Sequence, residues 1–267
     1  MSSTNSRMLS KRVSGPALGF VGILLFLLAW EAAPRLGLVQ ERFLPPASKV
    51  LAALVDYFGQ AAFWRDTGET MLAWGIGLAV SIIAAVILGL VIGSSSFLGK
   101  ATYTTIEFLR PIPSVALIPL AVLLLGVKIE SSLLLVIYAS FWQVLLQVLY
   151  GVADVDPVAD NTARSYGLGP LARARYVVWP TVLPYLITGI RLASAVALIL
   201  AITAELVIGS PGLGYQIALT QSGGAVPEMY ALIVATGIIG ILINLGMRLL
   251  ERRVLAWHSS IRSEVVA

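Results

Sequence analysis

Long apolar runs without charge are the feature that most constrains this chain. Residues 71–93 contain no Asp, Glu, Lys or Arg, and five further runs have a similar character. Such a run is long enough to cross the hydrocarbon core of a bilayer, about 30 Å thick, as an α-helix. Lipid offers no partner for backbone amides and carbonyls, and the runs lack the alternation of barrel strands, so we expect helices.

The sequence therefore predicts an all-α membrane protein with six transmembrane helices. The third span is short and contains Pro113 and Pro119, so it can cross only if its flanks are also helical. Of the 267 residues, 58% are hydrophobic and 12% are charged, against roughly 25% charged residues in soluble domains. This composition excludes a soluble enzyme. The expected spans are residues 13–30, 71–93, 112–127, 133–153, 181–208 and 229–250.

The distribution of basic residues predicts the orientation. With the N-terminus inside, 12 of the 18 Lys and Arg residues fall on cytoplasmic segments, 5 on outer segments, and Arg191 within a span. Because a basic excess marks the cytoplasmic side, both termini are expected in the cytoplasm. The net charge of +4 thus reflects membrane topology, and we expect lipid and no nucleic acid as a partner.

The first run could instead be a cleaved signal peptide, since basic residues precede its apolar core. We favour a retained span, because Glu31-Ala32-Ala33-Pro34 is a poor cleavage site. The expected organisation is then a cytoplasmic N-terminus with the first span (1–33), an outer loop (34–70), a five-helix core (71–250) and a cytoplasmic tail (251–267). In the outer loop a surface helix is predicted from apolar residues at helical spacing: Val50, Leu51, Leu54, Val55 and Phe58.

Residues 154–180 form the longest polar segment on the inner side. Asp156 followed by Pro157 is a good helix start, because aspartate caps a helix and proline is tolerated in its first turn. The segment from Gly167 to Pro170 is a good helix stop. We therefore predict two short helices joined by a glycine turn at the inner membrane surface.

This loop resembles a motif of binding-protein-dependent ABC importer permeases. Their pattern is Glu-Ala-Ala, three residues, Gly, nine residues, then Ile-x-Leu-Pro. Ala163, Gly167, Pro180 and the spacing match, whereas the sequence departs from the pattern at Asn161, Thr162, Val177 and Trp179. The resemblance covers roughly residues 20–255, including Ala204-Glu205 and the Gly212–Tyr215 stretch. It is strongest to the subgroup that handles sulfonates, taurine and nitrate.

The resemblance implies a type I importer fold in the bacterial cytoplasmic (inner) membrane. It implies a homodimer, two cytoplasmic ATPase subunits and an extracytoplasmic solute-binding protein as partners. The loop would be the coupling helix that docks into the ATPase. Because Asn161 replaces the glutamate, Asp160 is the substitute for any salt bridge made there. The expected coupling residues are Asp160, Asn161, Thr162, Ala163, Arg164, Gly167 and Pro180.

The chain is not expected to be an enzyme. The nearest match to a phosphate-binding loop, residues 94–101, lacks the first glycine and the Ser or Thr that holds Mg²⁺. We therefore expect no cofactor in this chain and place ATP and Mg²⁺ on the partner ATPase. There is no cysteine, and the single histidine, His258, lies in the polar tail, so no metal site is expected either.

Two ionisable residues, Arg191 and Glu205, lie within the fifth span, and such residues are functional candidates. They share a helix face about 21 Å apart, so they cannot pair. Between them a strip of small residues would let another helix approach, which we interpret as the centre of a dimer. Glu205 would then lie near the outer mouth of the pathway. Alternatively, Arg191 contacts lipid phosphates or loop carbonyls and Glu205 caps a loop. The strip comprises Gly189, Ala193, Ala197 and Ala201.

Gln143 and Gln147 are further pathway candidates, one turn apart on the fourth span. They either bind neighbouring helices or face the solute. The glycine-rich segment after the fifth span is either a candidate outer gate, with Gly212, Gly214 and Tyr215, or an ordinary loop.

We thus predict the permease subunit of an ATP-driven importer for a small polar or anionic solute, such as a sulfonate, taurine or nitrate. The alternative is a secondary transporter powered by an ion gradient. That class would be favoured by inverted repeats and several buried carboxylates. The sequence shows no convincing repeat and one deep carboxylate, Glu205.

Overall fold

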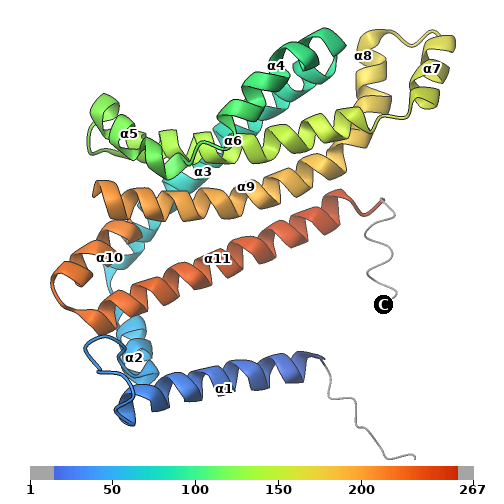
Figure 1. Ribbon diagram of the computed structural model, residues 1–267. Helices are drawn as coiled ribbons and strands as arrows, with labels where there is room; N and C mark the ends of the chain where they lie inside the picture. Colours follow the sequence, from blue (N-terminus) through green and yellow to red (C-terminus); the bar gives the residue numbers. More distant parts are fainter. Residues whose placement is uncertain (1–14, 258–267) are drawn as a thin grey trace, which may run out of the picture.

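The computed structural model describes residues 15–257, and its regular elements in this range are all helices (Figure 1). His258 and the rest of the tail lie outside the described residues, as do residues 1–14. The elements are α1 (Gly15–Arg35), α2 (Ala47–Phe58), α3 (Ala61–Gly93), α4 (Ser96–Leu109), η1 (Ser114–Leu117), α5 (Ile118–Leu125), α6 (Ile129–Ala153), α7 (Pro157–Ser165), α8 (Pro170–Arg173), the π-helical turn η2 (Ala174–Val178), α9 (Trp179–Ile208), α10 (Leu213–Ser222) and α11 (Val226–Val254).

The helices confirm an all-α membrane protein. Among the described residues, five helical stretches are long and apolar enough to cross a bilayer, and a helix pair bent by 80° makes a sixth candidate if its two arms form one span. The bent pair is α4 with the segment Ser114–Leu125, which lies within the third predicted span. Helix α4 is the helical flank that this short span was predicted to require. Pro111 and Pro113 interrupt the helix between the two arms, since proline has no backbone N–H to donate.

The helix ends and loops separate into two groups, as the predicted topology requires (Figure 1). The start of α1, the end of α11 and the α7–α8 loop lie at one end of the bundle, which we call the inner end. Helices α2 and α10 and the turn from α5 to α6 lie at the other, the outer end. The chain thus passes between the two ends six times when the bent pair counts as one passage.

Two helix boundaries differ from those expected. Helix α3 begins at Ala61 and so includes Asp66 and Thr70, which sequence analysis placed in the outer loop. Helix α9 does not start afresh near Pro180, because α8 passes through the π-helical turn η2 directly into α9. The outer helix α2 forms as predicted, and its buried Val50 and Leu54 pack in a cluster with Phe63 of α3 and Ala231 of α11.

The main core lies between α3, α6 and α9, where close packing depends on small residues. A Cβ at Gly189 of α9 would lie 3.0 Å from Cβ of Gln147 on α6. Ala193, Ala197 and Ala201 are fully buried within the single chain, and α9 makes its most extensive packing with α6. The small-residue strip is therefore covered by α6 of the same chain. Its assignment to the centre of a dimer was wrong, because α6 already occupies that face.

Helix α1 is peripheral and packs mainly on α2. The indole N–H of Trp30 donates to the carbonyl of Pro45 at 3.0 Å. Large apolar side chains of α1, including Phe20 and Phe26, are exposed, which suits a helix surrounded by lipid.

Two glycines of α3 test this packing. A Cβ at Gly89 would lie 2.6 Å from Val148 Cγ1, whereas a Cβ at Gly75 would have no neighbour within 4 Å. We expect Gly89→Ala to destabilise the protein by about 1–3 kcal/mol through overpacking. Gly75→Ala, on the same helix, should be neutral or slightly stabilising. Thermal unfolding in detergent measures both, and equal midpoints for the two variants would contradict the packing.

Candidate functional site

The α7–α8 loop at the inner end has the two-helix form predicted from sequence. The side chain of Asp156 accepts a hydrogen bond from the N–H of Val158 at 2.8 Å and so caps α7, with Pro157 in the first turn. The turn after α7 depends on Gly167, whose φ of 77° suits glycine. There the N–H of Leu168 returns to the carbonyl of Ala163 at 3.0 Å, a bond that satisfies the helix end.

Asp160 fixes the two helices of this loop together. Its Oδ1 accepts from Nε of Arg173 at 2.7 Å and its Oδ2 from Nη2 of Arg173 at 2.8 Å. Nη2 of Arg164, one turn along α7, lies 3.0 Å from Oδ2. The hydrogen bond to Arg173 is the main reason why the pKa of Asp160 lies below its ordinary value. This carboxylate is therefore charged at neutral pH and bound to arginines of its own loop.

The α7–α8 loop exposes apolar side chains on its surface. Val158, Tyr166 and Leu171 are 70%, 82% and 85% exposed. Asn161, Thr162, Arg164 and Gly167 are exposed as well, whereas Ala163 is turned into the loop and buried. Apolar groups gathered on a polar loop are typical of a protein contact. Pro180, the last of the predicted coupling residues, lies apart from them in the first turn of α9.

At the outer end, Glu205 of α9 is buried, with 1% exposure. Its Oε2 accepts from the hydroxyl of Thr70 at 2.9 Å and from the N–H of Gly214 at 3.0 Å. The same hydroxyl oxygen accepts from the N–H of Leu213 at 3.0 Å. Glu205 and Thr70 together satisfy the first backbone donors of α10 and join α10 to α9 and α3.

The glycines before α10 make room for this carboxylate. Gly209 has φ of 81° and ends α9, and Gly212 has φ of 147°. A Cβ at Gly212 would overlap the carboxylate of Glu205, and one at Gly214 would overlap the carbonyl of Ile202. Tyr215 is 36% exposed. The candidate outer gate is thus a closely packed connection that needs its glycines.

Asp66 is a member of this outer site that sequence analysis missed. It is 5% exposed, and its Oδ2 accepts from Nε2 of Gln216 on α10 at 2.8 Å. The signal was present, because Asp66, Thr70 and Ala73 follow helical spacing before the uncharged run begins. Helix α3 thus extends ten residues before the uncharged run, through a segment that carries charged side chains.

The remaining pathway candidates lie in different places. Nη1 of Arg191 pairs with Oε2 of Glu251 at 2.9 Å and so joins α9 to α11. Arg191 thus has a carboxylate partner within the chain and is far along α9 from Glu205. Gln143 is half-buried, and Gln147 lines a cavity at the inner end.

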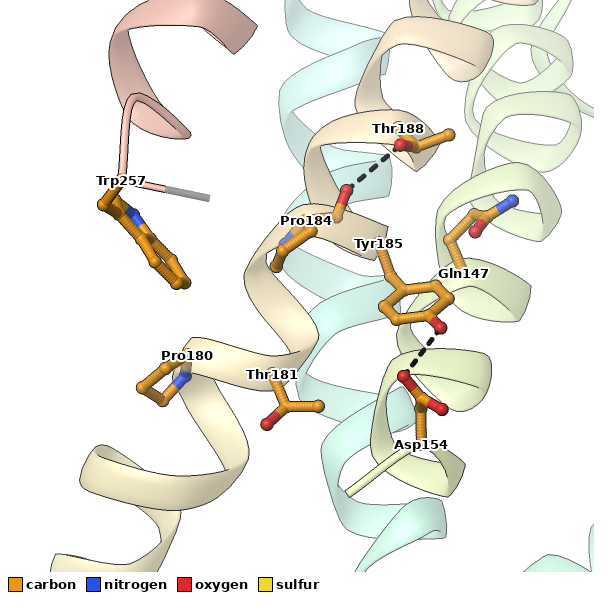
Figure 2. A pocket seen from close by; sticks show the side chains of 8 residues that line it. All are labelled: Gln147, Asp154, Pro180, Thr181, Pro184, Tyr185, Thr188 and Trp257. Carbon is orange, nitrogen blue, oxygen red and sulfur yellow. Dashed lines mark hydrogen bonds between the residues drawn. The ribbon is translucent and has the colours of Figure 1, made fainter. Parts of the chain in front are cut away.

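That cavity, of about 550 Å³, lies between the end of α6 and the start of α9 (Figure 2). Across it the hydroxyl of Tyr185 donates to Oδ2 of Asp154 at 2.9 Å. Sequence analysis missed Tyr185, although the lining residues of α9 follow helical spacing. These five are Pro180, Thr181, Pro184, Tyr185 and Thr188.

Comparison with known proteins identifies the class. Residues 77–256 match the family described as binding-protein-dependent transport system inner membrane component. The taurine transport system permease protein TauC of Escherichia coli (strain K12) is 29% identical over 92% of this chain and 90% of its own length. The putative aliphatic sulfonates transport permease protein SsuC of Bacillus subtilis (strain 168) is 28% identical, over 96% of this chain and 95% of its own.

Two more distant comparisons agree. The nitrate import permease protein NrtB of Leptolyngbya laminosa is 24% identical over 73% of this chain and 70% of its own length. A structure of the MetNI methionine ABC transporter in inward-facing conformations shares the fold. Its TM-score is 0.63 at 16% identity, covering 71% of this chain and 94% of that chain.

The chain belongs to the family of binding-protein-dependent inner-membrane transport components. It is the permease component of an ABC importer, a multi-span protein of the inner membrane, and family membership implies an ATPase and a binding protein as partners. ATP is used by the separate ATPase subunit, as predicted, and the permease family carries no cofactor.

Two threonines of α3 test the outer site. Thr70 bridges Glu205 and Leu213, whereas the buried Oγ1 of Thr67 has no hydrogen-bond partner among the described residues. We expect Thr70→Val to destabilise the protein by about 1–3 kcal/mol, because it leaves a buried N–H unsatisfied. Thr67→Val should be neutral or stabilising. Thermal unfolding distinguishes them, and a larger loss for Thr67→Val would refute the assigned network.

Proposed function

We propose that two copies of this chain form the pathway by which a small polar or anionic solute enters the cytoplasm. A binding protein delivers the solute outside, two ATPase subunits dock inside, and the dimer moves the solute by alternating access. The solute is a sulfonate, taurine, nitrate or a similar compound. The names of the relatives support this class, since they include permeases for taurine, aliphatic sulfonates and nitrate.

The observation that carries the proposal is the exposed α7–α8 loop. In our proposal the apolar side chains Val158, Tyr166 and Leu171 enter a groove of the ATPase. Asn161, Thr162 and Arg164 surround them as polar contacts. Asp160 contributes through the structure of the loop itself, because its pairing with Arg173 makes the loop one rigid unit. Gly167 supplies the turn that this unit requires.

Helix α9 then transmits the movement of the loop. It follows α8 through the π-helical turn, and Pro180 lies just after that turn. At its outer end α9 holds α10 through Glu205. A displacement of the loop would therefore be transmitted by α9 to the outer end, because no flexible segment lies between them.

The pathway candidates take roles along this helix. Glu205 holds the outer gate formed by Gly212, Gly214 and Tyr215 in its closed packing. Arg191 keeps α11 moving with α9 through Glu251. Gln143 and Gln147 of α6 offer amide groups to the solute. These two glutamines are one turn apart on the same helix.

Two glycines of the loop test the coupling role. Gly167 has φ of 77° and Gly169 has φ of −67°, and a Cβ at either position meets nothing within 4 Å. Gly167→Val therefore adds only backbone strain, on the order of 1–2 kcal/mol, which shifts the equilibrium constant for the correct loop conformation by about tenfold. Gly169→Val adds bulk without that strain.

The measurement is ATP hydrolysis by the reconstituted complex in vesicles, stimulated by loaded binding protein. We expect stimulation to fall in Gly167→Val, by up to about tenfold, and to stay near the wild-type level in Gly169→Val. Full stimulation in Gly167→Val would show that the turn does not couple the subunits.

A further inference from the structure

The inner cavity offers more hydrogen-bond acceptors than donors. Eight of the described residues line it, and among these Asp154 is the only charged one (Figure 2). Its volume of about 550 Å³ lies in the range of small-molecule sites, about 300–1,000 Å³. Among residues 15–257 no Lys or Arg lines it, so the described lining carries a negative charge.

Acceptor atoms are plentiful. Oδ2 of Asp154 accepts from Tyr185, whereas Oδ1 accepts no hydrogen bond from the part of the chain that the structure describes. The hydroxyls of Thr181 and Thr188 donate to the carbonyls of Val177 and Pro184. These hydroxyl oxygens keep lone pairs for a ligand.

Donor groups are scarce. Pro180 and Pro184 have no backbone N–H, and the hydroxyl hydrogen of Tyr185 is used on Asp154. The indole N–H of Trp257 donates to the carbonyl of Val254 at 3.1 Å. Among the lining side chains this leaves the amide of Gln147 as the donor available to a solute.

We propose that this cavity binds the ammonium group of an amino-bearing solute during its passage to the cytoplasm. Asp154 accepts a charge-assisted hydrogen bond from the ammonium, Tyr185 holds the carboxylate in place, and Gln147 donates to the anionic end of a zwitterion. The inference rests on the proposed function and narrows its solute class. An aminosulfonate fits the cavity, whereas a simple anion such as nitrate meets a carboxylate and a single donor.

The outer carboxylates offer no such site. Glu205 and Asp66 are buried, at 1% and 5% exposure, and both bind groups of α10. Asp154 is exposed at the end of α6 and faces open space. Of these three carboxylates, Asp154 is therefore the one that a solute in the cavity can reach.

The test is equilibrium dialysis of labelled taurine (2-aminoethanesulfonate) against the purified permease–ATPase complex, without nucleotide or binding protein. We expect saturable binding that excess ethylammonium displaces and that equal excesses of ethanesulfonate or nitrate leave intact. Asp154→Asn should weaken binding about tenfold, the loss of one charge-assisted hydrogen bond. Asp154→Glu keeps the negative charge and should bind taurine more tightly than Asp154→Asn does. Tyr185→Phe should weaken binding less.

Glu107→Gln is the matched control, because this carboxylate of α4 is half-exposed and lies outside the cavity; its binding should equal that of the wild type. Three results would each overturn the inference. They are a wild-type protein that shows no saturable binding, displacement of taurine by ethanesulfonate as effective as by ethylammonium, and taurine binding by Asp154→Asn as tight as by the wild type. ATP hydrolysis stimulated by loaded binding protein is measured on the same samples. If loaded binding protein stimulates ATP hydrolysis but taurine binding fails the test, the inference is wrong and the proposed function stands. If ATP hydrolysis is not stimulated, the proposed function is refuted.

Discussion

The close packing of α9 against α6 is the interaction on which the rest of the structure depends. In lipid no hydrophobic force drives two helices together, so contact requires small side chains and buried hydrogen bonds. Gly189, Ala193 and Ala197 supply the small surface on α9. Because α6 and α9 pack along their length, the loop between them lies at the inner end, where the pairing of Asp160 with Arg173 holds its two helices together. The outer end of α9 is then available to hold α10 through Glu205.

Features encoded by neighbouring residues could be predicted from the sequence. The Asp156-Pro157 start and the Gly167 turn define the loop helices, and both form as expected because capping and positive φ are local requirements. The spans could be predicted as well, because the hydropathy of a run depends only on consecutive residues. The short third span with Pro113 predicted that its flanks are helical, and α4 is one of them, but the 80° bend between the two arms was not predicted.

Features that need distant residues to meet were missed. The burial of Ala193 and Ala201 was expected, but the pattern of small residues does not reveal which helix covers them, and α6 does so within the chain. Thr70 and Glu205 lie far apart in the sequence and join only once α3 and α9 are packed. The inner cavity likewise needs α6, α9 and Trp257 together, so Asp154 looked like one more charge of a polar loop.

The central claim is that movement at the inner loop, powered by a separate ATPase, drives solute through this chain. Uptake of labelled taurine into proteoliposomes tests it most directly, with the permease reconstituted either alone or with its ATPase and loaded binding protein. We predict uptake only with the ATPase, its nucleotide and the binding protein, and no effect of ionophores that collapse ion gradients. Accumulation by the permease alone in response to an ion gradient would contradict the account and indicate a secondary transporter.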